Sequence, residues 1–384
     1  MMISYKYKLY KTKKTKHLLN MKREACFVWN HALNLQKRYY AIYGKYIPLS
    51  RLKHHFAKRI TRTYLYSQST QEILERLDEA YNRFFKHVAK RPPKSKSHRN
   101  FTSFVYKQSG YVLCGNTLHI NSVKRDYRFS YSRPYEGNVK QVRLKLSPKG
   151  DWYIYIITDA TPNTYVKSRN GASVGIDFGL KTYMTLSTGE KIKHPQFLKG
   201  DLKRLQRSAR MHSTKDKGSN NRERARIALN RVYEDIFNRR LDYQWKLAHE
   251  LCRSYDYIFI EDLSLTGMTK MWGRKMSDLA HGQFVCILEY IAQKYGCVVH
   301  KINRWYASSR LCDCGYKNDK LTLNDREWVC PMCGQIHDRD IHAASNILRR
   351  GIYELESGWK TSEAPAKGHP TKASSTKCPR IPSL

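Results

Sequence analysis

Two short apolar runs, each followed by a carboxylate, place the strongest constraint on how this chain folds. Val174-Gly175-Ile176 is followed by Asp177, and Tyr255–Ile260 is followed by Glu261. A long basic region with helical periodicity, at about residues 200–254, separates the two runs. Apolar runs of this length are typical of buried strands. Because strands that alternate with helices indicate an α/β domain, we expect this part of the chain to form one.

The residues ahead of this domain follow a different pattern. Helical periodicity at about 18–43 and 69–88 lies between a short alternating run at 3–10 and several β-type runs within 101–158. This order predicts an N-terminal β module that carries a helical insert. A basic, proline-containing run at 90–99 is expected to be either a solvated linker or a segment that follows a phosphate backbone.

Charge narrows the range of functions. The 384 residues include 71 Lys and Arg against 32 Asp and Glu, which gives a formal net charge of +39. Such an excess favours a polyanionic partner, because neutralised phosphates release their counterions. No segment approaches the roughly 20 consecutive apolar residues that span a bilayer, and the first residues contain no signal-peptide core. We therefore expect an intracellular protein that binds nucleic acid and no membrane.

Acidic residues are the minority here, so carboxylates at strand ends are candidates for catalysis. Phosphodiester hydrolysis by two metals requires several carboxylates around divalent cations roughly 4 Å apart, and Mg²⁺ prefers such oxygen ligands. Asp177 and Glu261 follow buried strands, and Asp340 opens a short helix after His337-Asp338-Arg339. Any one of them alone is more often a cap or turn residue. The three together, in a basic chain, predict a metal-dependent nuclease site.

Two closely spaced cysteine pairs predict a zinc site. The pairs are Cys312 with Cys314 and Cys330 with Cys333. Paired thiolates at the two ends of a short hairpin hold Zn²⁺ tetrahedrally. The first pair has a one-residue spacer, so both of its sulfurs reach one ion only with strain, and His337 is a candidate replacement for Cys312. The alternative is a metal-free hairpin with buried thiols.

The order of these motifs resembles that of the TnpB family, the transposon-encoded relatives of type V CRISPR effectors. The matching segments cover residues 171–350 densely and are, in order, Val174–Leu180, Ser219–Arg222, Ile260–Ser264 with Gly267-Met268, Ser308–Cys312, Cys330–Gly334 and His337–Asp340. The first 170 residues match the family only in general character.

The resemblance implies a multidomain fold of α+β and α/β parts. An N-terminal wedge β-barrel with a helical recognition insert precedes a RuvC-like nuclease of RNase H-like fold, which a zinc-ribbon-like module for target nucleic acid interrupts. The expected boundaries are 1–12 and 101–168 for the wedge β-barrel, 13–100 for the helical insert, 171–305 and 336–352 for the nuclease, 306–335 for the zinc module and 353–384 for a disordered tail.

The resemblance also implies a function. It points to a transposon-associated, RNA-guided DNA endonuclease that cuts beside a short flanking motif, with base pairing to the RNA reading the sequence. The implied partners are a structured guide RNA and double-stranded target DNA, in the cytoplasm of a prokaryote, with no small-molecule cofactor. The implied catalytic acids are Asp177, Glu261 and Asp340, which would hold two Mg²⁺ ions or Mn²⁺ in their place. The four cysteines Cys312, Cys314, Cys330 and Cys333 would hold one structural Zn²⁺.

The sequence departs from the family pattern at two places, and two other functions stay open. His342 stands where the family has Asn, and the first cysteine pair is shortened. Asp338 competes with Asp340 as the third acid, and the family register favours Asp340. The other functions are a guided or unguided DNA-binding protein that never cuts, and a RuvC-type resolvase that needs no RNA. The intact acids argue against the first, and the helical insert, the zinc module and the charge argue against the second.

Overall fold

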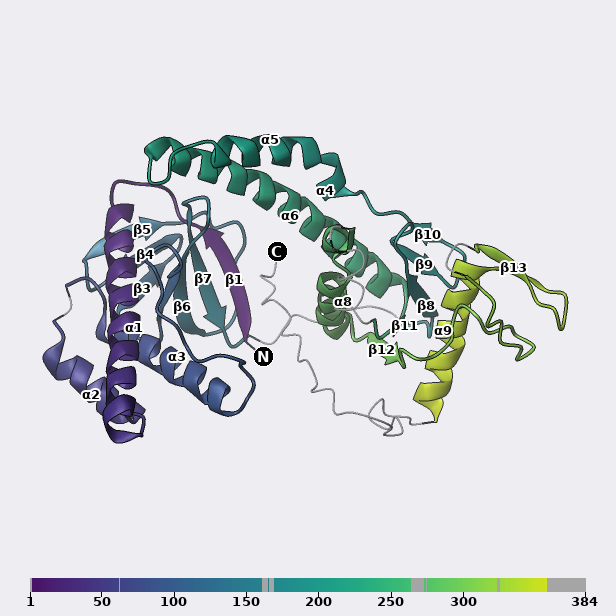
Figure 1. The fold of residues 1–384 in the computed structure, drawn as a ribbon, viewed down its shortest axis with the longest axis horizontal. Helices are drawn as coiled ribbons and strands as arrows, with labels where there is room; N and C mark the ends of the chain where they lie inside the picture. Colours follow the sequence, from purple (N-terminus) through teal and green to yellow (C-terminus); the bar gives the residue numbers. More distant parts are fainter. Residues whose placement is uncertain are drawn as a thin grey trace. The chain divides into compact units, whose positions relative to one another are not determined.

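The computed structural model describes residues 2–61, 63–160, 165, 169–263, 273, 275–322 and 325–357. The chain divides into two compact units, one on each side of the bond between Pro162 and Asn163. Figure 1 traces the elements of both units. Within the described ranges, no helix combines the length and the apolar character needed to cross a lipid bilayer.

The first unit consists of two antiparallel sheets and a helical insert. The elements are β1 (Ile3–Lys8), α1 (Thr15–Tyr43), α2 (Leu49–Arg59), α3 (Ser67–Phe85), β2 (Ser103–Tyr106), β3 (Tyr111–Cys114), β4 (Thr117–Ile120), β5 (Arg125–Arg128), β6 (Val139–Leu146) and β7 (Trp152–Thr158). One sheet has the order β1-β7-β6-β2, and the other has the order β3-β4-β5. The helices therefore separate β1 in sequence from the strands with which it pairs, as the alternating and helical patterns predicted.

The predicted wedge β-barrel is wrong, because neither sheet of this unit is closed in the part of the chain that the structure describes. In the four-stranded sheet, β1 and β2 are the two edges and do not pair with each other. An isolated bridge between Leu9 and Phe129, rather than a ladder, follows the end of β1. Closure requires a continuous circuit of tilted, staggered strands, and the four-residue strands β2 to β5 are too short to complete one.

The basic run at 90–99 is fixed against α1. The Asn30 side chain donates to the Lys96 carbonyl and accepts from the Lys96 N–H, each at 2.8 Å. Trp29 Nε1 donates to the Lys94 carbonyl at 3.1 Å, and the Lys96 ammonium lies 3.7 Å from the centre of the Trp29 ring. The run is therefore an ordered part of the insert and not a free linker.

The second unit is an α/β domain with a small hairpin module. Its elements are β8 (Ser173–Phe178), β9 (Met184–Leu186), β10 (Lys191–Ile192), α4 (Phe197–Gly200), α5 (Leu202–Ser213), α6 (Asn220–Ser254), β11 (Tyr257–Glu261), α8 (His281–Tyr295), β12 (Val298–Ile302), β13 (Glu327–Val329), β14 (Ile336–Asp338) and α9 (Arg339–Glu356). The main sheet has the order β10-β9-β8-β11-β12, in which β8, β11 and β12 are parallel. The whole chain is thus a mixed α/β, multidomain fold.

The two faces of the main sheet are covered by different helices. Ile258 and Ile260 of β11 belong to an apolar core with α6 and α8. Phe259, which lies between them, belongs to a separate core with Ile347 of α9. Because successive side chains of a strand point to opposite faces, α6 and α8 cover one face and α9 covers the other (Figure 1).

The last turn of α9 overlaps the disordered tail that was expected at 353–384. The helix continues to Glu356, so residues 353–356 are helical, and the rest of the expected tail, from residue 358 on, lies outside the described residues. The motif segment Gly267-Met268 also lies outside them.

Candidate functional site

Asp177 is the next-to-last residue of β8, and Glu261 is the last residue of the neighbouring parallel strand β11. β8 and β11 pair with Ile176 opposite Ile260, so the next residue along each strand is a carboxylate. Ile176 and Ile260 both point into the core with α6 and α8. Since side chains alternate along a strand, Asp177 and Glu261 point to the other face, the one that α9 covers.

Asp340 lies in the first turn of α9, and the competing acid Asp338 has a different role. Asp338 is the N-cap of the helix: its Oδ1 accepts from the backbone N–H groups of Asp340 and Ile341, each at 3.1 Å. Its Oδ2 pairs with Lys191 at 2.7 Å. Asp338 is thus occupied in capping, which is a common use of Asp at this position.

Asp177, Glu261 and Asp340, here called the acidic cluster, are linked through their charges, because Asp177 interacts with each of the other two. Among the described residues, only the four cysteines bring three or more possible ligand atoms within 4.8 Å of one another. The pKa of Asp177 is raised to about 6, first by burial and then by the charge of Asp340. The pKa of Glu261 is raised to about 7 by burial and by the charges of Asp177 and Asp262. Carboxylates that repel one another in this way are stabilised by a nearby cation. The all-oxygen donor set fits Mg²⁺, which prefers a few carboxylates together with water and phosphate oxygens.

Arg326 is a residue of this cluster that the sequence did not single out. Its guanidinium donates to both carboxylate oxygens of Asp340, at 3.0 and 2.9 Å. It also lowers the pKa of Asp177, opposing the effects of burial and Asp340. Arg326 lies in the segment between the cysteine pairs, and nothing in its spacing distinguishes it from the other Lys and Arg residues, of which the chain has 71 in all.

Two glycines let α9 approach the sheet closely. A Cβ on Gly175 of β8 would lie 2.1 Å from the Ala344 carbonyl oxygen and 2.6 Å from the Leu348 nitrogen, both backbone atoms of α9. A Cβ on Gly351 of α9 would lie 2.0 Å from the Phe259 ring. Since real Cβ contacts are never this short, these glycines set how closely α9, and with it Asp340, lies over β8 and β11.

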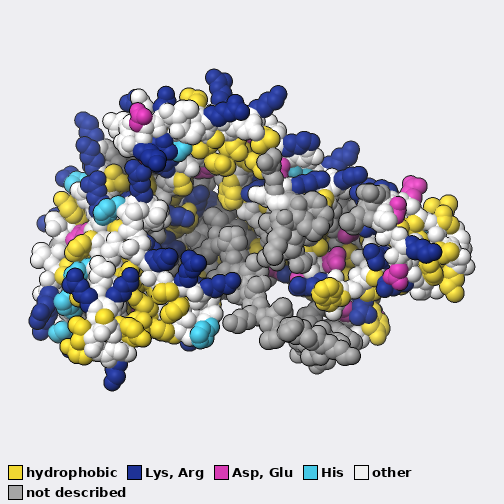
Figure 2. Space-filling view, in the orientation of Figure 1, with side chains coloured by type: hydrophobic (Ala, Val, Ile, Leu, Met, Phe, Trp, Pro, Cys, Tyr) yellow, Lys and Arg dark blue, Asp and Glu magenta, His cyan; other side chains and the backbone are white. Residues whose placement is uncertain are grey.

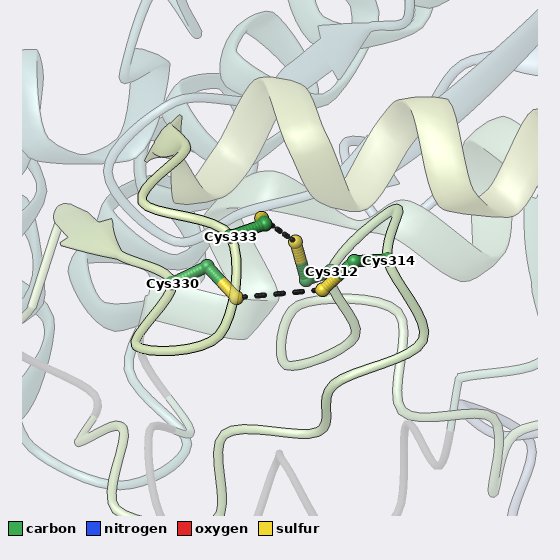
Figure 3. Close-up of side chains that lie close together, drawn as sticks. All are labelled: Cys312, Cys314, Cys330 and Cys333. Atoms are coloured by element: carbon green, nitrogen blue, oxygen red, sulfur yellow. Dashed lines mark hydrogen bonds between the residues drawn. The ribbon is translucent and has the colours of Figure 1, made fainter.

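The four predicted cysteines converge at one point (Figure 3). Their sulfurs all lie within 4.8 Å of one another. Cys312 Sγ lies 3.5 Å from Cys333 Sγ, and Cys314 Sγ lies 3.6 Å from Cys330 Sγ. Four sulfurs around a tetrahedral Zn²⁺, each bonded at about 2.3 Å, lie about 3.8 Å apart. The donor set and its spacing therefore fit one Zn²⁺.

A tight turn lets the shortened pair supply both of its sulfurs. The N–H of Gly315 donates to the Cys312 carbonyl at 3.0 Å, and the N–H of Cys312 donates to the Tyr316 carbonyl at 2.8 Å. Gly315 has a φ of +89°, which suits glycine and few other residues. Cys312 therefore reaches the cluster without replacement, and His337 lies beside it, with Nε2 at 3.1 Å from Cys312 Sγ.

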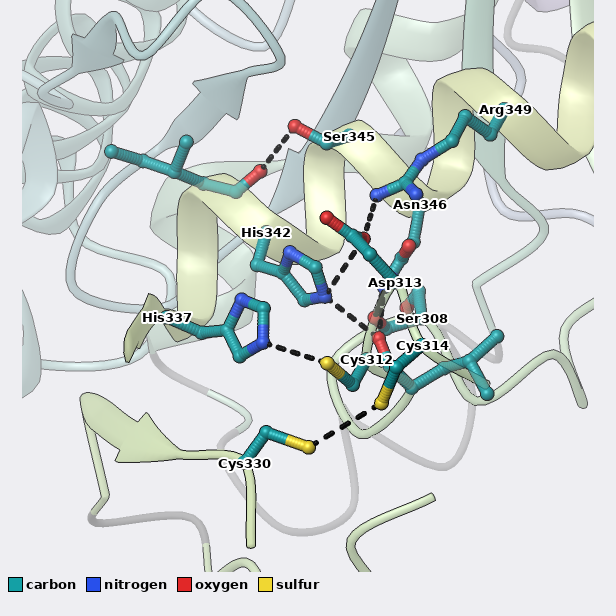
Figure 4. Close-up of polar contacts among 12 residues, drawn as sticks. Ser308, Cys312, Asp313, Cys314, Cys330, His337, His342, Ser345, Asn346 and Arg349 are labelled. Atoms are coloured by element: carbon teal, nitrogen blue, oxygen red, sulfur yellow. Dashed lines mark hydrogen bonds and ion pairs between the residues drawn. The ribbon is translucent and has the colours of Figure 1, made fainter. Parts of the chain in front are cut away.

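The helix α9, which carries Asp340, also contacts the loop Ser308–Cys314, here called the cysteine loop (Figure 4). His342 Nε2 lies 2.7 Å from the Leu311 carbonyl oxygen, and its ring contacts that of His337 in a tilted arrangement, with centroids 3.9 Å apart. Asn346 donates to the carbonyls of Ser308 and Leu311, at 2.7 and 2.8 Å. The residue that departs from the family pattern, His342, thus connects α9 to the cysteine loop.

Three protein-family models match segments of the chain. The model OrfB_IS605, described as "Probable transposase", matches residues 156–271. The Cas12f1-like TNB domain matches residues 281–347, a range that includes the four cysteines and Asp340. A helix-turn-helix domain model matches residues 1–45, where the structure has β1 and the long helix α1.

Known proteins resemble the chain over most of its length. A protein of Streptomyces pristinaespiralis named "Putative RNA-guided DNA endonuclease" is 35% identical over 287 residues, which are 73% of this chain and 71% of that protein. "Putative RNA-guided DNA endonuclease InsQ" of Escherichia coli (strain K12) is 29% identical over 374 residues, 91% of this chain and 92% of that protein. Among solved structures, the chain is similar in fold to Cas12f1 in a Cas12f1-sgRNA-target DNA complex, with a TM-score of 0.57, 13% identity and coverage of 88% of this chain and 83% of that one.

Proposed function

The chain belongs to the TnpB (OrfB_IS605) family, and from that premise we propose that it is an RNA-guided endonuclease that cuts target DNA beside a short flanking motif. The observation that carries the proposal is the acidic cluster. Asp177 and Glu261 lie at the carboxyl ends of adjacent strands, on the face that α9 covers, and Asp340 lies in the first turn of α9. Burying two carboxyls so that their pKa values rise lowers the stability of the fold. Strongly shifted pKa values of this kind are concentrated at functional sites.

We assign the acids to metal binding and their neighbours to positioning. Two Mg²⁺ ions, or Mn²⁺ in their place, would be held by Asp177, Glu261 and Asp340 and would supply an activated water and stabilise the leaving oxygen. Asp338 fixes the first turn of α9 by capping it. Arg326, which contacts Asp340, is placed to offer its guanidinium to a phosphate oxygen of the bound strand.

The nucleic-acid contacts are assigned by charge and by domain. Figure 2 shows Lys and Arg side chains gathered over α5 and the adjoining part of α6. The exposed basic residues there are Lys203, Arg204, Arg207, Arg210, Lys215, Lys217, Arg224 and Arg231. We propose that this surface follows the backbone of the guide RNA or of its duplex with the target strand. We assign recognition of the flanking motif to the N-terminal unit, with residues 13–100 as its recognition insert, and contact with target nucleic acid to the zinc module at 306–335.

The test of the function is to change the guide. The protein should purify with a structured RNA whose end pairs with the target. When that end is rewritten, cleavage should move to the newly matching DNA beside the same flanking motif, because base pairing and not the protein reads the sequence. The measurement is mapping of cut sites by sequencing, with Mg²⁺ present and with each of two unrelated guides.

Two controls separate the proposed function from its alternatives. Digesting the RNA before adding DNA should abolish cleavage. Cutting that survives digestion, or that ignores the guide sequence, would replace the proposal with an unguided resolvase. Guided binding without any cutting, in either Mg²⁺ or Mn²⁺, would favour a DNA-binding protein that does not cleave.

Gly175, which lies against α9, allows a test of whether this helix sets the position of Asp340. Gly175→Ala should lower the free energy of unfolding by about 1–3 kcal/mol, because the added methyl group overpacks the interface with α9. A displacement of Asp340 by about 1 Å should also slow cleavage roughly 100-fold. The matched control is Gly200→Ala, whose Cβ would meet no atom within 4 Å. Unchanged single-turnover cleavage by Gly175→Ala would mean that α9 does not set the position of the third acid.

A further inference from the structure

Of the five tryptophans that the structure describes, one is placed unlike the other four. Among the described residues, Trp29, Trp152, Trp245 and Trp328 are at most 6% exposed, whereas Trp305 is 85% exposed. An indole in water leaves a large apolar area unburied. It is the most exposed large apolar side chain in the described part of the chain.

Trp305 lies in the turn that follows β12, the strand next to β11. β12 pairs in parallel with β11, and Ile302, the last residue of β12, is opposite Glu261. The N–H of Asp262 also donates to the Ile302 carbonyl at 3.3 Å. Trp305 follows Ile302 by three residues, so the turn that carries it leaves the same edge of the sheet at which Glu261 ends β11.

The turn that carries the indole is held on both sides. The Trp305 N–H donates to Asn303 Oδ1 at 2.9 Å, and the Arg304 guanidinium binds Asp262, with Nε at 3.0 Å from Oδ2. On the other side, Tyr306 packs against the core between α9 and the sheet, and the Arg350 guanidinium lies 5.6 Å from its ring centre. Because its neighbours are anchored, the exposure of Trp305 is set by the fold and not by a loose loop.

We propose that Trp305 is a stacking site for one unpaired nucleobase of the DNA strand that enters the acidic cluster. Aromatic rings bind bases of single strands through their π-faces, with little dependence on sequence. The basic side chain of Arg304 adjoins the indole in sequence, and the chain carries a net charge of +39, which favours nucleic acid over a protein partner as the occupant. Stacking of the neighbouring base would hold the phosphate of the strand near Glu261. The proposal rests on the proposed function, because it takes DNA as the substrate of the acids.

The test removes either the indole or the base. With the wild-type complex, an abasic site at one of the positions flanking the mapped cut should slow single-turnover cleavage roughly tenfold, as expected for the loss of one stacked base. Trp305→Ala should slow cleavage of intact DNA to the same extent and should show no further loss on the abasic DNA. Trp305→Phe, which keeps a stacking ring, should recover most of the rate. The matched control is Tyr257→Ala, which removes an exposed ring (38% exposed) from the opposite end of β11 and should behave as wild type.

Two outcomes would overturn the proposal. One is wild-type cleavage by Trp305→Ala, which would mean that the indole serves another partner. The other is a slowed variant that remains as sensitive to the abasic site as wild type, which would indicate a structural role. A second readout is independent of cutting: 2-aminopurine at the same position in single-stranded DNA should be quenched by wild-type protein and not by Trp305→Ala. If wild type cuts no DNA with any guide, the proposed function fails, and the quenching measurement still decides the stacking site.

Discussion

Replacing Asp177 by Asn, Glu261 by Gln or Asp340 by Asn should abolish DNA cleavage and leave guided binding of the target intact. Each amide keeps the shape of the side chain and removes a charge that would hold a divalent cation. Metal ions contribute several kcal/mol of charge stabilisation to such reactions, and about 1.4 kcal/mol is worth a factor of ten in rate. We therefore expect single-turnover rates to fall at least roughly a thousandfold. A gel-shift assay with the same guide should show binding that is equal or tighter, because a negative charge has left a basic surface.

Asp338→Asn provides the matched control for this experiment. Asn caps helices about as well as Asp, and the lost ion pair with Lys191 is partly exposed and worth little. We expect near wild-type cleavage. An active Asp340→Asn together with an inactive Asp338→Asn would assign the third acid to Asp338. Full activity of Asp177→Asn or Glu261→Gln would remove that residue from the site.

The strands that carry the acids could be predicted because local pattern and tertiary position agree there. Val174-Gly175-Ile176 and Tyr255–Ile260 contain little besides apolar residues and glycine, and such runs form strands buried on both faces, which here become β8 and β11. The β-type runs expected within 101–158 likewise correspond to strands there, β6 and β7 among them. Gly175 lies two residues before Asp177 in the sequence, but its contact with the backbone of α9 depends on a helix more than 160 residues further along the chain.

The features that the sequence did not predict depend on long-range geometry. The wedge β-barrel was expected from the resemblance, and the open sheets show that strand closure is not encoded in the pattern of any one strand. Arg326 could not be distinguished among so many basic residues, because its partner Asp340 becomes its neighbour only when the β13-β14 hairpin forms. The exposure of Trp305 was equally hidden, since tryptophan is by default a core residue.

Each chain should bind one Zn²⁺ ion, and Cys312→Ser or Cys330→Ser should release it. Both cysteines are buried, with 2% and 1% of the residue exposed. Each has its sulfur within 3.6 Å of a sulfur of the opposite pair. Structural zinc contributes on the order of 10–16 kcal/mol of apparent binding free energy to small modules. The described apolar core of the zinc module is small and lies around Trp328 and Leu321. We therefore expect the module to unfold when the ion leaves. Elemental analysis of the purified protein gives the stoichiometry, and Cys114→Ser, an exposed thiol of the other unit, is the control that should keep its zinc.

Loss of the ion should also affect the proposed catalytic acids, because the cysteine loop is bound to α9, the helix that carries Asp340. Asn346 and His342 of α9 bind the carbonyls of the loop that ends at Cys312, and Arg326 of the same module binds Asp340. Disordering the module removes these contacts, and the loss of supporting contacts around metal sites typically costs about 10–100-fold in activity. We expect cleavage to fall by that factor in Cys330→Ser while the pairing of β8 with β11, and hence the core of the domain, is retained.

Zinc that persists in Cys312→Ser but not in Cys314→Ser would show that the shortened pair supplies one ligand. His337, with Nε2 at 3.1 Å from Cys312 Sγ, would then be the candidate for the fourth ligand. Folded wild-type protein that contains no zinc would contradict the assignment altogether.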